Sequence, residues 1–323
     1  MRIVILAGGY GGAKLTHGLA MVARAPGWHG APFELSVIVN TGDDVEVHGL
    51  LVCPDLDTIL YTLAGLANEA TGWGLRDETW SAAEMLARLG APTWFRVGDG
   101  DLAIHTLRTQ RLREGARLTD IEADLATRLG VSTRVLPMTE ARVRTELRTD
   151  HGWLEFQDYF VRRGHADEVH EIRFAGIESA RPTPEVLDAI AGADRIVVAP
   201  SNPFVSIGTI LALPGMPEAL AAAQAPIVAV SPIIGGTAVR GPADRMFASL
   251  GGEASALGVA RHYADRYPGV LDGLVIDEVD AGQAEAIGRL GLACRVTATL
   301  MLGDDDRRRL ALEVLAFGDD LVG

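Results

Sequence analysis

The chain has 323 residues, of which 48% are hydrophobic and 22% charged, a composition typical of a globular protein with a large core. The formal net charge of −14 repels phosphate backbones and anionic lipids, which argues against a nucleic-acid-binding or membrane-surface protein. Two distant cysteines, Cys53 and Cys294, have no zinc-site spacing and fit a reducing compartment. The apolar start leads into glycines and a lysine, and the apolar stretch 207–234 is interrupted by prolines. We therefore expect a cytoplasmic protein without a membrane span.

The first 70 residues predict a nucleotide-binding α/β unit. Residues 2–7 form a short apolar run that ends at glycines, as a buried parallel strand does, and residues 13–25 have helical spacing. Residues 35–39 and 50–52 are two further predicted strands. A helix with an acidic first turn is expected over 55–67.

The middle of the chain differs from this pattern. Three segments with helical spacing come first, at 79–89, 102–114 and 119–129. Three predicted strands follow, at 134–138, 143–149 and 152–161, the last two joined by a hairpin turn at 150–152. We expect residues 75–170 to be an insertion, helical first and then β-rich.

Alternation of strands and helices returns after residue 171. Strands are predicted at 195–199, 227–231 and 274–276, and helices are predicted to begin near Pro184 and to cover 254–267 and 304–317. The predicted fold class is α/β, a Rossmann-like doubly wound parallel sheet. Its core is expected to consist of residues 1–74 and 171–323, with ligands at the carboxyl ends of the strands.

The first candidate site is the glycine-rich segment Gly8-Gly9-Tyr10-Gly11-Gly12-Ala13-Lys14, between a predicted strand and a predicted helix. Backbone N–H groups at such a position can hold a phosphate, and Lys14 can add a charge. The pattern is neither the dinucleotide fingerprint nor a Walker sequence, so a simple tight turn remains the alternative.

Acidic residues follow the next strand, in Asn40-Thr41-Gly42-Asp43-Asp44, and again in Asp55-Leu56-Asp57. One of them can be explained as a helix-capping residue. Four carboxylates on neighbouring loops at a phosphate site favour Mg²⁺, which binds one or two carboxylates together with substrate phosphates. Asp43 is the leading candidate ligand.

Polar loops follow two later strands. Ser201 and Asn202, between prolines, are suited to hydrogen-bonding a nucleotide, with a turn before a capped helix as an equal alternative. Arg240, after Gly235-Gly236, can meet a second phosphate or a nucleobase. Trp94 begins a segment, 94–101, whose aromatic residues can stack on a flat ring, although core packing is the more common role of Trp94 and Phe95 individually. His48 and His105 are treated as ordinary residues unless they lie in a pocket.

Several ordered stretches resemble one family, the 2-phospho-L-lactate transferases (CofD-like) of coenzyme F420 biosynthesis. They are GGYGGAKL, NTGDD, CPDLDT, GWGLRDETW, FRVGDGDLA, FQDYFV, APSNPFVSIGTIL and VSPIIGGTAVRGPAD, running from Gly8 to Asp244. Each stretch is weak alone, but the ordered set is specific. The part of the chain after Asp244 matches by architecture only.

The resemblance implies a homodimer that binds the deazaflavin Fo and a guanylylated three-carbon phospho-acid. The ribityl hydroxyl of Fo would attack the distal phosphorus of this donor with Mg²⁺ present, release GMP and form a phosphodiester. Carried over to this sequence, the resemblance makes Asp43 and Asp55 the metal ligands and Asp43 and Asp57 the catalytic carboxylates. The residues expected to hold the nucleotide are Gly8, Gly9, Gly11, Gly12, Lys14, Ser201, Asn202 and Arg240, and those expected to face the deazaflavin are Asn40, Thr41 and Trp94.

Two other readings stay open at this point. A related glycine-rich α/β group binds nucleotide sugars without turnover, and a nucleotidyltransferase is compatible with the first loop. The stretches DLDT and FQDYF favour the transferase. The residues do not indicate which three-carbon acid the donor carries: phosphoenolpyruvate, 2-phospho-L-lactate or 3-phosphoglycerate. The composition is rich in Arg and Ala, as is typical of proteins from GC-rich bacterial genomes, and this favours phosphoenolpyruvate as the acid of the donor.

Overall fold

A seven-stranded sheet, all of whose strands run parallel, forms the centre of the computed structural model, which describes residues 1–24 and 28–322. Its order is β14-β13-β10-β9-β1-β2-β5. The bounds are β1 (Arg2–Ala7), β2 (Glu34–Val39), β5 (Arg134–Pro137), β9 (Arg195–Val198), β10 (Ile227–Val230), β13 (Gly273–Ile276) and β14 (Ala293–Val296). The predicted α/β class with a doubly wound parallel sheet is confirmed.

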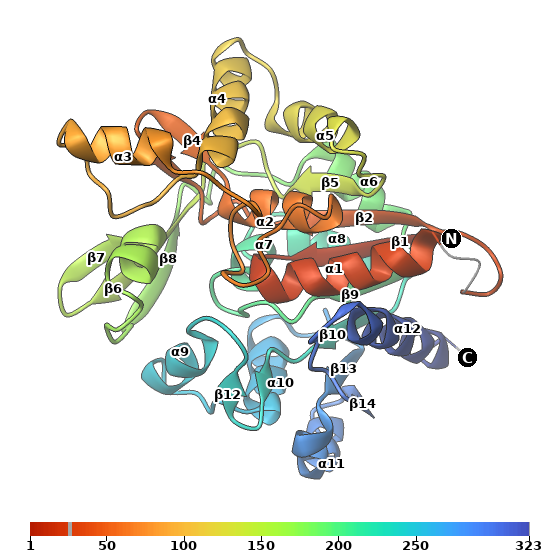
Figure 1. The fold of residues 1–323 in the computed structure, drawn as a ribbon. Helices are drawn as coiled ribbons and strands as arrows, with labels where there is room; N and C mark the ends of the chain where they lie inside the picture. The colour runs from red at the N-terminus through yellow and green to blue at the C-terminus, as the bar shows by residue number, and fades with distance from the viewer. Residues whose placement is uncertain (25–27, 323) are drawn as a thin grey trace.

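Helices cover both faces of this sheet, which explains why its central strands are apolar at nearly every position. In β1, Ile3 and Ile5 belong to the core on one face, whereas Val4 and Leu6 belong to the core on the other. The first face is covered by α1 (Gly9–Arg24), α2 (Pro54–Leu63), α5 (Leu118–Arg128) and α12 (Asp304–Asp320) (Figure 1). The second is covered by α6 (Pro184–Ala191), α7 (Ile207–Leu211), α8 (Met216–Ala222), α9 (Ala243–Ser249), α10 (Ala256–Arg266) and α11 (Ala284–Gly288).

Two smaller units lie beside the sheet (Figure 1). One is an antiparallel sheet of β7 (Gly152–Glu155), β6 (Arg144–Thr149) and β8 (Glu171–Ala175). The other joins the hairpin β3 (Val45–Val47) and β4 (Leu50–Val52) to α3 (Ser81–Arg88) and α4 (Asp99–Arg113). The remaining elements are β11 (Ile233–Ile234), β12 (Thr237–Ala238) and the short helices Asp158–Arg162 and Glu278–Gln283.

The expected boundaries of the insertion need a correction. Strand β5 lies within 75–170 but pairs with β2 at the edge of the main sheet, and β8, from the expected core, pairs with β6 instead. The predicted strand 152–161 ends at Glu155, because the chain then turns into the π-helical segment Asp158–Arg162. The helix predicted over 13–25 begins at Gly9, and its predicted end at Ala25 lies outside the described residues.

The order of strands reverses between β1 and β9, which are neighbours although more than half of the chain separates them. Ligands of doubly wound sheets bind at such a point, beyond the carboxyl ends of the strands. The glycine-rich segment follows β1 there, and the loop with Ser201 follows β9. None of the helices within 1–24 and 28–322 combines the length and apolar character of a membrane span.

Candidate active site

The ends of β1 and β9 meet the first turn of α2 at one point. The Ser201 hydroxyl accepts a hydrogen bond from the Gly8 N–H (3.2 Å) and donates one to the Gly8 carbonyl (2.7 Å). The Gly9 N–H donates to Asp55 Oδ1 at 2.8 Å. A Cβ atom on Gly8 would lie 2.5 Å from Asp55 Oδ2, so a larger residue at this position would displace the carboxylate. Three segments distant in sequence thus form one rigid corner.

The predicted glycine loop is in fact the first turn of α1. Two of its glycines are required by close packing: a Cβ atom on Gly11 would lie 2.5 Å from the Pro200 carbonyl oxygen, and one on Gly12 would lie 2.7 Å from Ser201 Oγ. The N–H groups of a first helical turn have no partner within the helix and carry the positive end of the helix dipole. The corner therefore offers an anion site at the start of α1.

Cationic side chains gather next to this turn, around the Tyr10 ring. Lys14 Nζ lies 4.6 Å and the Arg240 guanidinium 4.9 Å from the ring centre. Lys14 also donates to the Met301 carbonyl at 2.7 Å, and burial, followed by the nearby Arg307 charge, lowers the pKa of Lys14. Lys14 and Arg240, predicted separately, are thus brought together beside the anion site in a protein of negative net charge.

Asn40 organises the loop after β2 from a fully buried position. Its Nδ2 donates to Asp55 Oδ2 at 3.0 Å, and its Oδ1 accepts from the Gly42 N–H at 2.8 Å. A Cβ atom on Gly42 would lie 2.5 Å from Thr209 Cγ2. Asn40 therefore joins the loop 40–44 to α2.

Three oxygens of the loop 40–44 are buried without a hydrogen-bond partner among the described residues: Thr41 Oγ1, Asp43 Oδ1 and Asp44 Oδ1. Folded proteins rarely leave buried polar atoms unpaired, so three in one loop indicate a ligand. Burial, and next the charge of Asp55, raise the pKa of Asp43 well above its ordinary value. Burial likewise raises the pKa of Asp55. Like charges held together in this way favour a bound cation.

The donor set fits Mg²⁺ in particular. Within the described residues no three His, Cys, Asp or Glu side chains converge on a complete metal site. Mg²⁺ does not need one, because it takes one or two carboxylates and completes its shell with phosphate oxygens and water. Asp43 has a free oxygen, and Asp55 lies between it and the anion site of α1. These two residues are the chain's candidates to hold the ion.

Asp57, the other expected catalytic residue, has a different environment. Both of its carboxylate oxygens accept hydrogen bonds from Arg108, whose side chain is 0% exposed. Arg108 Nε also donates to the buried Glu122 at 2.7 Å. The geometry therefore places Asp57 in a buried ion network behind the first turn of α2. Arg108 and Glu122 belong to no motif of the sequence, and nothing local could have identified their pairing with Asp57.

The small sheet and the helical turn that follows it support the loop 40–44 from the side. The Thr145 N–H donates to the Gly42 carbonyl at 2.7 Å, and Gln157 Nε2 donates to the Asp43 carbonyl at 3.0 Å. Gln157 lies in the stretch FQDYF, so the motif that suggested the family also fixes the backbone of the metal-site candidate. No local signal in this stretch predicts the role of Gln157, because its partner lies 114 residues away in the chain.

Asn202 holds the loop after β9 in shape. Its Oδ1 accepts from the Phe204 N–H at 2.9 Å, and its Nδ2 lies 3.4 Å from Met246 Sδ. Phe204 lines a cavity of about 830 Å³. Ser201 therefore contacts the glycine turn directly, whereas Asn202 acts on the loop itself.

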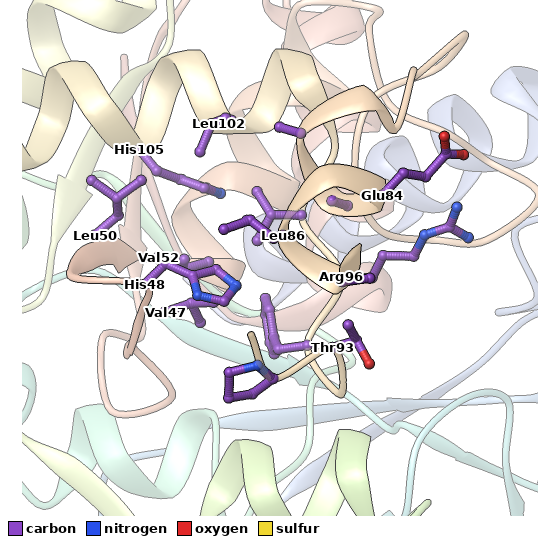
Figure 2. Close-up of a pocket in the computed structure, with 16 residues that line it drawn as sticks. Val47, His48, Leu50, Val52, Glu84, Leu86, Thr93, Arg96, Leu102 and His105 are labelled. Carbon is purple, nitrogen blue, oxygen red and sulfur yellow. The ribbon is translucent and has the colours of Figure 1, made fainter. Parts of the chain in front are cut away.

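A second, smaller cavity of about 270 Å³ lies between the β3–β4 hairpin, α3 and α4 (Figure 2). Its lining is mostly apolar and includes Phe95, His48 and His105. Trp94 does not line it: its ring packs edge-on against Phe95 at 5.6 Å and lies beneath the Arg162 guanidinium at 4.5 Å. Val47, His48, Leu50 and Val52 of the hairpin form part of its wall, and this hairpin begins two residues after Asp43.

A doubly wound sheet with an anion site, clustered cations and a carboxylate pair at its switch point defines an enzyme of nucleotide and phosphoryl chemistry. The sequence profile of the family "2-phospho-L-lactate transferase CofD" matches residues 3–289, and the chain belongs to this family. The predicted membership and enzyme class are confirmed: the chain is a transferase of coenzyme F420 biosynthesis.

Similar proteins agree with this assignment over almost the whole chain. A phosphoenolpyruvate transferase of Streptomyces griseus is 44% identical over 326 residues, covering 99% of both chains. A phosphoenolpyruvate transferase of Mycobacterium avium is 43% identical over 321 residues, covering 93% of this chain and 94% of the relative. A crystal structure of a UPF0052 family member from Bacillus halodurans has the same fold, with a TM-score of 0.67, 16% identity, and coverage of 98% of this chain and 100% of the other.

Proposed function

We propose that the protein transfers a phosphoenolpyruvyl group from a guanosine-diphosphate-activated donor to the ribityl hydroxyl of the deazaflavin Fo, releasing GMP. Family membership supports the reaction, and the names of relatives at 43–44% identity favour phosphoenolpyruvate over 2-phospho-L-lactate and 3-phosphoglycerate as the acid. The observation that best supports the proposal concerns the loop 40–44. Three of its buried oxygens have no hydrogen-bond partner within 1–24 and 28–322, and Asp55 links this loop to the proposed anion site at the start of α1. The transferase is preferred to the nucleotide-sugar-binding alternative because the matched relatives are named as transferases.

The donor diphosphate would lie at the first turn of α1, between its N–H groups and the cations Lys14 and Arg240. Mg²⁺, held by Asp43 and Asp55, would neutralise charge on the transferring phosphoryl group. The flat ring of Fo would enter the cavity lined by Phe95, because the β3–β4 hairpin that forms part of its wall follows directly after the loop 40–44. The ribityl chain would then run from the cavity towards Asp43.

The reaction forms one bond and breaks one. The ribityl oxygen attacks the distal phosphorus, the P–O bond to the GMP phosphate breaks, and GMP leaves with the bridging oxygen. The hydroxyl proton would pass to a carboxylate, for which Asp43 is the candidate because its Oδ1 has no hydrogen-bond partner within the described residues. Asp57 would act through position, by fixing the turn that carries Asp55. Alignment of the two substrates contributes most, because an alcohol is a poor acid.

A turnover assay tests this proposal. Purified protein, Fo and Mg²⁺ are incubated with each guanylylated acid in turn, and the products are analysed by mass spectrometry. We expect the phosphodiester of phosphoenolpyruvate, with GMP released in equal amount and no product in EDTA. Product from another acid alone would overturn the choice of donor, and no product from any acid with folded protein would overturn the reaction. The predicted homodimer is checked on the same sample by light scattering.

A further inference from the structure

His105 of α4 lies at the boundary between the 270 Å³ cavity and the buried ion network of Asp57. The side chain is 3% exposed, and Nδ1 lies 3.3 Å from Arg108 Nη1. An arginine guanidinium has only donors, so Nδ1 must accept this hydrogen bond through its lone pair. The ring is then neutral, with its proton on Nε2.

Arg108 cannot change this arrangement easily. It is fully buried, and Asp57 and Glu122 hold its guanidinium from two sides. Its charge is permanent, so it always presents a donor to His105. Burial lowers the pKa of His105, more than the charge of Asp57 raises it, which also favours the neutral ring. The nearest oxygen of Asp57 is 3.6 Å from Nδ1, beyond hydrogen-bond distance.

The second ring nitrogen, Nε2, is left for the cavity. It has no hydrogen-bond partner among the described residues, and it is not one of the unpaired atoms that the protein encloses completely. His105 lines the cavity, and Figure 2 shows its ring among apolar neighbours such as Val52, Leu86 and Leu102. The cavity therefore presents one directed N–H donor within an apolar wall.

We propose that His105 is the specificity-determining residue of the acceptor site, with its Nε2–H donating to a ring oxygen of the acceptor and its tautomer fixed by Arg108. The inference rests on the proposed function, since it takes the cavity as the site of the Fo ring. A flat heterocycle with a carbonyl or hydroxyl oxygen on its edge satisfies the donor. A purely hydrocarbon ring of the same shape would leave the donor unpaired, which is unfavourable in an apolar site.

Variants of His105 test the donor. His105→Phe keeps an aromatic ring and removes the N–H, whereas His105→Gln places an amide N–H near the position of Nε2. We expect His105→Phe to weaken Fo binding in calorimetry, and to raise the KM for Fo, by about tenfold, the value of one buried hydrogen bond. Turnover at saturating Fo and the affinity for GDP stay near wild type. His105→Gln recovers most of the lost affinity.

A histidine outside the cavity provides the matched control. His151→Phe changes an exposed ring in the turn between β6 and β7, and is expected to bind Fo as the wild type does. Equal Fo affinity of wild type and folded His105→Phe would overturn the inference. Failure of the proposed function looks different, because the wild type itself would then neither bind nor convert Fo.

The tautomer is measured on the wild-type protein, so the inference stays testable if the Phe variant does not fold. Nitrogen-15 NMR of histidine-labelled protein should give, for His105, an unprotonated Nδ1 and a protonated Nε2 whose signal shifts when Fo is added. A protonated Nδ1, or a His105 signal unmoved by saturating Fo, would overturn the assignment.

Discussion

Replacing Asp43 by asparagine should stabilise the metal-free protein while abolishing its activity. Asp43 and Asp55 are both buried, Asp43 Oδ1 has no partner within the described residues, and each carboxylate is desolvated without a cation beside it. Burial raises the pKa of Asp55 from 3.8 to about 6. The folded state therefore prefers the protonated form more than the unfolded chain does.

The magnitude follows from this shift. At about 1.4 kcal/mol per pH unit, the rise for Asp55 corresponds to roughly 3 kcal/mol of lost stability above pH 6. Because the pKa of Asp55 is higher in the folded than in the unfolded state, stability falls with rising pH. It is greatest below the unfolded pKa near 3.8 and is lost as the pH rises through about 6. Burial and the charge of Asp55 raise the pKa of Asp43 well above its ordinary value, so the neutral side chain of Asp43→Asn should bring a gain of about 1 to 3 kcal/mol at pH 8, or a melting temperature higher by about 2 to 6 °C.

Thermal melting in EDTA and in Mg²⁺, from pH 5 to 8, measures this effect. In EDTA the wild type should lose stability with rising pH more steeply than Asp43→Asn. Mg²⁺ should stabilise the wild type but not Asp43→Asn. Asp77→Asn is the control, because its carboxylate is 92% exposed and asparagine tolerates its positive φ. A variant that melts below the wild type in EDTA, or that Mg²⁺ stabilises equally, would refute the reasoning.

Three further substitutions probe the surroundings of this site. Gly11→Ala should place a methyl group against the Pro200 carbonyl, destabilise the fold by about 1 to 3 kcal/mol and weaken GDP binding, as measured by melting and calorimetry; unchanged GDP affinity would contradict it. Asp57→Asn should leave Arg108 underpaired and reduce the free energy of unfolding in urea by about 3 to 5 kcal/mol, and a loss below 1 kcal/mol would argue against a buried network. Gln157→Leu should lower kcat about tenfold without changing the KM for the donor, because it removes one buried hydrogen bond that fixes the loop 40–44. Turnover equal to that of the wild type would exclude this role of Gln157.

The sequence by itself determined the framework of the protein. Continuous apolar runs that end at Gly8, Asn40 and Pro200 predict parallel strands buried on both faces, because only such strands have no polar side. The carboxyl ends of parallel strands share one edge, so the glycine-rich turn, the acidic loop and Ser201 were expected together, and they meet there. The order of the motifs along the chain indicated the family to which the protein belongs.

Local patterns did not determine which strands join which sheet. The strand predicted at 134–138 is present, but the sequence did not predict that it pairs with β2. The pattern of apolar and polar residues along a strand is the same in either sheet. The strand predicted over 152–161 ended early, since the π-helical turn 158–162 depends on Phe156 and Tyr159 packing into a core with Leu147, Val205 and Met246.

Only the tertiary structure decided the role of each side chain at the site. Asp43, Asp55 and Asp57 are equivalent as sequence letters, but of these three only Asp57 forms an ion pair with Arg108, 51 residues further along the chain. No local pattern distinguishes His105 from an ordinary histidine, whereas the fold places its ring between this arginine and a cavity. Periodicity and turn chemistry are encoded by neighbouring residues, whereas the charge and hydrogen-bond partner of a buried group depend on residues that folding brings to it.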